Sequence, residues 1–452
     1  MPASEWGGSE WGGTEWAGDG STSAPTTTIS RGVPQILISF DGTPLDPTTW
    51  NWVDVTAYAD AEISIERGRS NEFDEPAAGS ASFRLRNDQR RFDALHTAGP
   101  YFGKLKPRRP CQINMIVGTS TFTLFTGFVH RWPQRFDDRD RSYWVTVRAT
   151  DLLGILQAEG FYPARPFTWD DPDLGLFDAN NLYVGTPSFD DVHRAGSRIT
   201  ALLTRVGVPT SLLDLDAGLS LLAAGEVTSE TIGEELALIT QTELGELYCA
   251  ADGRLTFVQR HGWSARPQMA ADQLTLSDDL TVTSAGPYVG LAWDADDERL
   301  IINEVTRKLP NGLERRARSH TSRLERGLRS RTIDTIHASV DEAKALAQWQ
   351  IDRYAGAQLR IEQVSLNPEA RPDVLWPAVC ALDLGARVLV KHRPQNVGAE
   401  ISQACRIIGI RHELRGLDLE TTWQLTSVDP TSYLRFDDPT LGLLDTTNKW
   451  AP

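Results

Sequence analysis

The sequence predicts a mainly β protein with an α+β insert, in which two tube-like domains, each a β-barrel or sandwich, flank a small α+β module. Two observations lead to this fold class. Short runs of β-forming residues, separated by turn residues, fill both halves of the 452-residue chain. Between them, residues 197–265 combine helical periodicity with one clear hairpin signal.

The first domain is expected over residues 34–157. Its predicted strands are residues 35–40, 61–66, 80–86, 112–117, 121–129 and 142–148. In Ser80–Arg86, apolar Ala81, Phe83 and Leu85 alternate with polar residues, which is the period of a half-buried strand. Strands this short and numerous indicate an antiparallel barrel or sandwich.

The next segment, residues 158–196, is rich in Pro, Asp, Asn and Gly and is expected to be an extended linker. In the module after it, Ser197 is predicted to cap a first helix. Thr231 and Glu234 have the spacing of a capping box for a second helix. Asp252 and Gly253 separate two apolar runs and predict a hairpin.

A second β-rich domain with one helix is expected over residues 266–430. The predicted strands are residues 273–276, 301–308, 332–336, 358–366, 387–391, 405–414 and 421–428. Ser339 and Glu342 form another capping box, which opens a helix that ends near residue 355.

Both ends of the chain lie outside these units. The N-terminal arm, residues 1–33, is rich in Trp and Gly and carries Trp6, Trp11 and Trp16 in repeated Glu-Trp pairs. A flexible tail and an arm that docks on a partner fit it equally well. The C-terminal strip, residues 431–452, contains a segment, 436–445, that closely matches linker residues 169–178. Both copies carry leucines that we expect in a packing or interface strip: Leu174, Leu176, Leu441 and Leu443.

Composition narrows the class of function. Acidic side chains number 61 and basic side chains 45, which gives a net charge of −16, and such a field repels nucleic acid. No apolar run is long enough for a membrane span, so no stable membrane insertion is expected. Neither a secretion signal nor a paired-cysteine motif is present, so we expect synthesis in a cytoplasm with buried thiols.

Several segments resemble a known family. Residues 63–69, 78–87, 91–93, 99–102, 105–110 and 124–129 are similar to the opening domain of minor tail proteins of long-tailed actinobacterial phages. The later layout resembles the baseplate hub proteins beneath the tail tube, in which trimers present pseudo-sixfold symmetry to a hexameric tube. The resemblance covers roughly residues 34–430 and implies a structural protein of the virion tail tip.

The partners that this resemblance implies are further copies of the chain, a tail tube or distal tail protein, the tape measure protein and other minor tail proteins. A trimer is expected first, with a hexamer as the alternative. DNA would pass through transiently without specific binding.

No catalytic constellation is visible. The chain lacks the common hydrolase, zinc-protease and nucleotide-binding motifs, and its eight histidines stand singly. Neither of two Asp-rich segments, 137–140 and 170–173, has the spacing of a calcium loop. We therefore expect no enzyme activity, no cofactor and no metal.

The strongest local charge is a basic stretch over residues 307–331, centred on Arg315, Arg316 and Arg318. In an acidic protein, we expect such a stretch to pair with acidic surface on an adjacent subunit, with a solvated face as the alternative.

The function hypothesis is a ring that connects the tail tube to distal tip proteins and encloses a channel for the genome. Two alternatives remain. One is a receptor- or glycan-binding tip protein, possibly one that degrades cell wall, since the arm's Trp residues could stack on sugars. The other is a hexameric distal tail ring.

Overall fold

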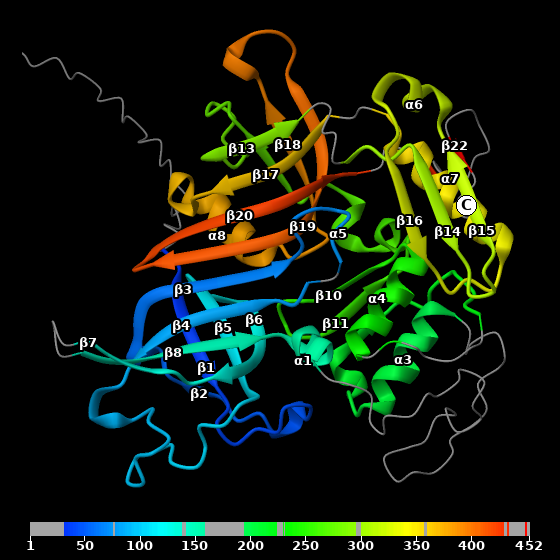
Figure 1. Ribbon diagram of the computed structural model, residues 1–452. Helices are drawn as coiled ribbons and strands as arrows, with labels where there is room; N and C mark the ends of the chain where they lie inside the picture. Colours follow the sequence, from blue (N-terminus) through cyan, green and yellow to red (C-terminus); the bar gives the residue numbers. More distant parts are fainter. Residues whose placement is uncertain are drawn as a thin grey trace, which may run out of the picture.

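The computed structural model describes residues 31–60, 62–75, 77–137, 142–158, 194–223, 229, 231–294, 300–356, 359–428, 432–433 and 448–449. Its dominant feature is a 14-stranded sheet (Figure 1). The first half of the chain contributes β1 Val33–Ile38, β2 Val53–Asp54, β3 Ala59–Gly68, β4 Ser80–Arg86, β5 Arg109–Val117, β6 Ser120–Arg131, β7 Gln134–Asp137 and β8 Ser142–Thr150. The second half contributes β12 Leu274–Ser277, β13 Gly290–Asp294, β17 Arg360–Leu366, β18 Arg387–His392, β19 Ile401–Arg415 and β20 Asp418–Ser427.

The two halves are joined by one antiparallel strand pair. β19 pairs with β3 from Gly409 opposite Gly68 to Arg415 opposite Glu62, so the strand order runs β13-β17-β20-β19-β3-β4-β8-β6-β5-β1-β2. The predicted mainly β fold with a small α insert is confirmed. The proposed boundaries of the individual domains stay a prediction.

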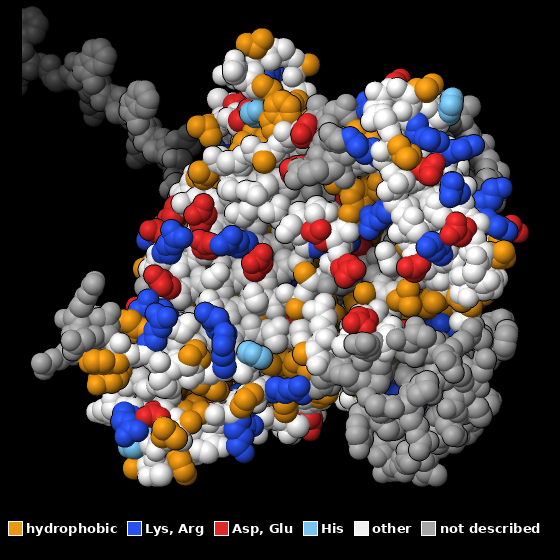
Figure 2. All heavy atoms as spheres, in the orientation of Figure 1, with side chains coloured by type: hydrophobic (Ala, Val, Ile, Leu, Met, Phe, Trp, Pro, Cys, Tyr) orange, Lys and Arg blue, Asp and Glu red, His pale blue; other side chains and the backbone are white. Residues whose placement is uncertain are grey.

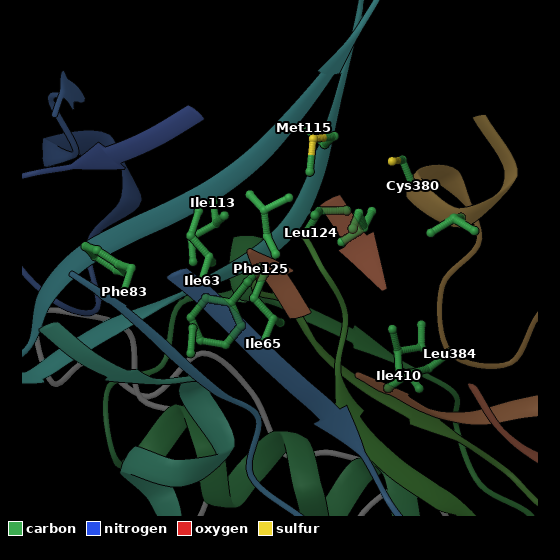
Figure 3. Packing of buried hydrophobic residues seen from close by; sticks show 14 of the residues in the cluster. Ile63, Ile65, Phe83, Ile113, Met115, Leu124, Phe125, Cys380, Leu384 and Ile410 are labelled. Carbon is green, nitrogen blue, oxygen red and sulfur yellow. The ribbon is translucent and has the colours of Figure 1, made fainter. Parts of the chain in front are cut away.

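The main hydrophobic core lies along this sheet and takes residues from both halves. Ile63 and Ile65 of β3 alternate with exposed Glu62 and Glu66, as a half-buried strand requires. Figure 3 shows side chains of β3, β4, β5 and β6 on the same cluster as Ile410 of β19, and all of these labelled residues are buried.

A helix that the sequence did not predict, α8 Pro372–Ala381, covers part of this core with buried Trp376. Its two prolines suggest a helix breaker, but Pro372 occupies the first turn, where the missing N–H costs nothing. Pro377 is tolerated inside a helix whose apolar face is buried.

An α+β module lies beside the sheet (Figure 1). It consists of α1 Leu152–Ala158, α3 Ala195–Arg205, β9 Leu213–Leu215, α4 Ile232–Glu243, β10 Glu246–Cys249 and β11 Leu255–Val258, around a second core. The Thr231 capping box and the hairpin are both present, with Gly253 at φ +90° in the turn.

The predicted role of Ser197 is wrong, because this residue lies inside α3. The helix begins at Ala195, and no side-chain cap is needed there. The Ala195 and Gly196 N–H groups donate instead to the carbonyls of Ser220 and Ala217.

The segment after residue 300 contains a third unit. Strands β14 Glu304–Lys308, β15 Glu314–Arg318 and β16 Ser330–Asp334 form their own sheet, and α6 His320–Arg326 and α7 Val340–Tyr354 accompany them. The unit has a separate core that includes Val305, Ile333 and Ile351. We expected one helix over residues 266–430, and with α5 Pro267–Ala270 and α8 the structure has four in the described part of this range. The short helices α5 and α6 are too brief for a periodic apolar pattern.

Two further short strands, β21 Ser432–Tyr433 and β22 Asn448–Lys449, pair with each other near the end of the chain. Among the described residues, no helix has the length and apolar character needed to cross a membrane.

The β3–β19 junction offers a test. Gly68 has φ +81°, and a Cβ there would lie 2.2 Å from the Ile408 carbonyl oxygen. We expect Gly68→Ala to lower the free energy of unfolding by at least about 3 kcal/mol, because it combines a disfavoured φ with a clash against backbone. Urea denaturation measures this loss.

The matched control is Gly416→Ala in the β19–β20 turn. Gly416 has φ +68°, but nothing lies within 4 Å of the added Cβ, so we expect a loss of only about 1 to 2 kcal/mol. Equal losses in the free energy of unfolding for Gly68→Ala and Gly416→Ala would show that the contact at the junction adds nothing to the cost of the positive φ.

Candidate functional site

In the described part of the chain, side chains from segments far apart in the sequence meet in buried clusters, which we call joints. The first joint is an ion-pair cluster where three parts of the chain meet. Glu246 opens β10 of the module, and its carboxylate binds Arg406 of β19 at 2.5 and 2.6 Å and Arg69, just after β3, at 2.5 Å. Nearby, buried Arg67 of β3 pairs with Asp383 at 2.7 Å.

Electrostatics at Glu246 favour the charged form. Burial alone raises the pKa of this carboxyl group, but the guanidinium groups of Arg406 and Arg69 outweigh it and lower the pKa to about 2. Arg406 also lies over the Trp263 ring at 4.5 Å from its centroid.

The second joint is centred on Glu72, in the segment between β3 and β4. Its carboxylate pairs with Arg360 of β17 and accepts hydrogen bonds from the Tyr354 hydroxyl at 3.2 Å and the Thr426 hydroxyl at 2.9 Å. One acidic side chain therefore ties the first half to the second half and to α7.

The third joint lies between the module and the β14–β16 unit. Arg307 of β14 is fully buried, and its Nη1 donates to the Thr242 carbonyl at 3.1 Å and to His337 Nε2 at 2.6 Å. Burial is the largest cause that lowers the pKa of His337, and the positive charges of Arg307 and Arg260 lower it further, to about 3. The ring therefore stays neutral and can accept this hydrogen bond.

A small cavity beside the first joint is lined by residues that include Arg69, Glu246 and Trp263. Its volume is about 20 Å³, which is room for one water molecule. In the described parts of the chain, no group of three or more His, Cys, Asp or Glu residues could hold a metal ion. The four cysteines are free and buried, and burial raises the pKa of Cys111, Cys380 and Cys405 to about 12 and that of Cys249 well above its usual value.

The predicted basic stretch divides between interior and surface. Arg307 is buried, and Arg331 contacts the Phe73 ring. Arg316 and Arg318 of β15 are exposed, and Arg315 is half-buried. Figure 2 shows blue side chains gathered over this unit.

The outward face of β3, β4, β19 and β20 carries charges of both signs (Figure 2). We call this surface, which includes Asp60, Arg84, Arg411, Glu413 and Arg415, the ladder face. Arg84 pairs with Asp60 at 2.9 Å, and Glu413 pairs with Arg411 at 2.5 Å and Arg415 at 2.9 Å. The positive charges named here are thus largely balanced by adjacent carboxylates.

The sheet ends in edge strands with exposed apolar side chains. β13 lies at one end, where Trp293 and the preceding Val289 are 42% and 70% exposed. β2 lies at the other end and carries exposed Val53. Unpaired strand edges with apolar side chains are suited to contacts with another chain.

The other predicted interface residues lie outside the described residues. These are Trp6, Trp11 and Trp16 of the arm and Leu174, Leu176, Leu441 and Leu443 of the two matching segments. The sequence did not predict the joints around Glu72, Glu246 and Arg307. No sequence signal identifies them, because Glu72 and Arg360, for example, lie 288 positions apart.

With this geometry, the chain is similar to two solved tail proteins. It matches the tail protein from Neisseria meningitidis MC58 with a TM-score of 0.53 and 14% identity, over 88% of this chain and 97% of that one. It matches the 43 kDa tail protein of prophage MuSo2 from Shewanella oneidensis with a TM-score of 0.51 and 14% identity, over 87% of this chain and 98% of that one. No protein-family model and no curated protein sequence matches it. The chain therefore has the fold of these tail proteins over nearly its whole described length.

The first joint predicts a pH-dependent variant. Glu246→Gln leaves Arg406 and Arg69 without their counter-charge, so we expect a loss of roughly 3 to 5 kcal/mol in the free energy of unfolding at pH 7. Because the folded pKa lies below the ordinary value of 4.5, the contribution of Glu246 to stability is full above pH 4.5 and disappears as pH falls through about 2. Denaturation at several pH values should show the gap between variant and wild type closing over that window.

The control is Glu413→Gln, which removes the same charge from two ion pairs of the ladder face. We expect it to cost less than about 1 kcal/mol, because these pairs lie at the surface. Equal losses for Glu413→Gln and Glu246→Gln would contradict the special role of the buried joint.

The third joint predicts a different pH window. The folded pKa of His337, about 3, lies below its unfolded value of 6.5, so the unfolded chain takes up the proton first. Stability from the neutral ring is full above pH 6.5 and is lost as pH falls toward 3.

His337→Gln keeps an acceptor for Arg307 and removes this titration. We expect its stability relative to wild type to improve as pH falls below 6.5, by up to about 1.4 kcal/mol per pH unit. A constant difference between pH 7 and 4 would contradict a buried neutral imidazole.

Proposed function

We propose that the protein is a non-enzymatic structural component of a phage tail tip, a hub protein whose copies form a ring between the tail tube and the distal tip proteins. The observation that carries this proposal is one sheet through both halves of a chain that shares its fold with two tail proteins over 88% and 87% of its length. A continuous hydrogen-bonded sheet, locked by the Glu72 and Glu246 joints, is a stiff element suited to the wall of a ring.

We take three copies as the assembly, with tail tube or distal tail protein, tape measure protein and other minor tail proteins as neighbours. The edge strands β13 and β2 support self-assembly, because exposed Val289, Trp293 and Val53 would be covered between copies. The leucine strips at Leu174, Leu176, Leu441 and Leu443 are proposed to pack on neighbours as well.

The ring would enclose a channel through which the genome passes. The ladder face fits its wall, because arginines held by adjacent carboxylates offer few free cations to DNA phosphates. The acidic net charge of −16 further disfavours binding of DNA during passage.

Native mass spectrometry of the purified protein tests the assembly, with an expected mass of three times the 50.0 kDa chain. Electron microscopy of labelled virions should place it at the tail tip. Six copies per ring would instead support a distal tail ring, and a stable monomer absent from particles would overturn the proposal. The receptor-binding alternative is tested by incubating the protein with host envelopes. Binding to sugars or release of envelope fragments would favour that alternative.

A further inference from the structure

The outer side of the β14–β16 sheet is a basic surface without an assigned partner. Along β15, Ala317 is buried against the core of the unit, while Arg316 and Arg318 face solvent. Lys308 of β14 is exposed beside them, and Arg323 of α6 reaches the same side. We call these four residues and their immediate surroundings the basic face.

Carboxylates of the same sheet offset only part of the charge of the basic face. Glu304 is shared between Arg316 at 3.9 Å and Arg323 at 3.5 Å. Within the described residues, Lys308 and Arg318 make no side-chain ion pair. Glu314 and Asp334 flank Lys308 in the strand register and are exposed on the same side. Four basic side chains thus stand against the three carboxylates of Glu304, Glu314 and Asp334, which leaves a local excess of one positive charge in a protein whose net charge is −16.

The basic face also has an open strand edge and apolar neighbours. β15 is an outer strand of its sheet, so within the described chain one side of its backbone pairs with no strand. Leu313, Leu324 and Leu328 are exposed around it, at 44%, 75% and 52%. A partner that fits this surface is extended, acidic and rich in large apolar side chains.

The N-terminal arm has this chemistry. Residues 1–30 contain Glu5, Glu10, Glu15 and Asp19 and no Lys or Arg, and each of the three glutamates precedes a Trp. Indole rings stack favourably on guanidinium groups, and the protein uses this contact elsewhere, with Arg84 over Trp144 at 4.4 Å. The glycines after each Trp allow the arm's backbone to approach a strand closely.

The root of the arm lies on a different side of the molecule from the basic face of the same chain. Arg31 pairs with Glu369 at 3.0 Å and with Asp418 at the β19–β20 turn, and Gly32 lies so close to Trp376 that a Cβ would approach its ring to 2.4 Å. In Figure 1, the β19–β20 turn lies on the left of the molecule and the β14–β16 sheet on the right. The residues between Arg31 and the Trp repeats span at most about 45 Å when extended, so the repeats are able to extend beyond the surface around the root.

We infer that the Glu-Trp repeats of one copy, residues 5–18, bind the basic face of a second copy. The carboxylates pair with Arg316, Arg318 and Lys308, and the indoles cover Leu324 and Leu328 or stack on the arginines. This inference deepens the proposed function, because it rests on copies lying side by side in an assembly.

A peptide of residues 1–20 with a fluorescent label tests recognition without the ring. We expect it to bind protein that lacks residues 2–18, and to bind at least tenfold more weakly to the same protein with Arg316→Glu and Arg318→Glu. The matched control, Arg411→Glu with Arg415→Glu, makes the same change of charge on the ladder face and should leave binding unchanged. A peptide with all three Trp replaced by Ala should also lose at least tenfold.

Zero-length carbodiimide cross-linking of a mixture of ¹⁴N- and ¹⁵N-labelled full-length protein tests the arrangement between copies. Links from Glu5, Glu10 or Glu15 to Lys308 that join light and heavy chains support the inference, and links only within one isotope form overturn it. The inference is overturned, even if rings form, when the peptide fails to bind or when it binds equally well to the variant with Arg316→Glu and Arg318→Glu. If the peptide binds but the full-length protein stays monomeric, the binding of the arm to the basic face is supported and the proposed ring is overturned.

Discussion

The structure depends on the antiparallel pairing of β3 with β19. Strands distant in sequence bury their backbone N–H and C=O groups against each other along this pair, so separating the halves would expose many polar groups and a shared core at once. The close packing of Gly68 against the Ile408 carbonyl fixes the end of the pair. The two halves therefore share one continuous sheet and one hydrophobic core.

Buried ion pairs reinforce the union of the two halves. Glu72 and Glu246 each bind arginines from other parts of the chain, and each carboxylate satisfies several donors. Removing one partner from such a cluster leaves an uncompensated charge in a poorly solvated site, which costs far more than losing a surface pair. The relative positions of the sheet, the module and the β14–β16 unit are thus specified by few side chains.

The basic stretch over residues 307–331 contributes both to a buried joint and to an exposed face. The geometry of its strands decides which basic side chain is buried and which is exposed. In β14, Arg307 points toward the module and meets His337, while Lys308, one residue later, faces solvent. In β15, Ala317 points inward, and Arg316 and Arg318 point outward. Because side chains alternate along a strand, neighbouring basic residues become a buried joint and an exposed face.

Local sequence signals determined the mainly β class, the Thr231 and Ser339 helix starts and the Asp252–Gly253 hairpin, because each depends on interactions within a few residues. Only the tertiary structure decided that β3 pairs with β19, that α3 needs no side-chain cap and that Arg307 is buried. It also decided that Glu72 meets Arg360. These contacts join residues far apart in the chain, and alternation or capping patterns carry no information about which distant partner a strand or a charge will meet.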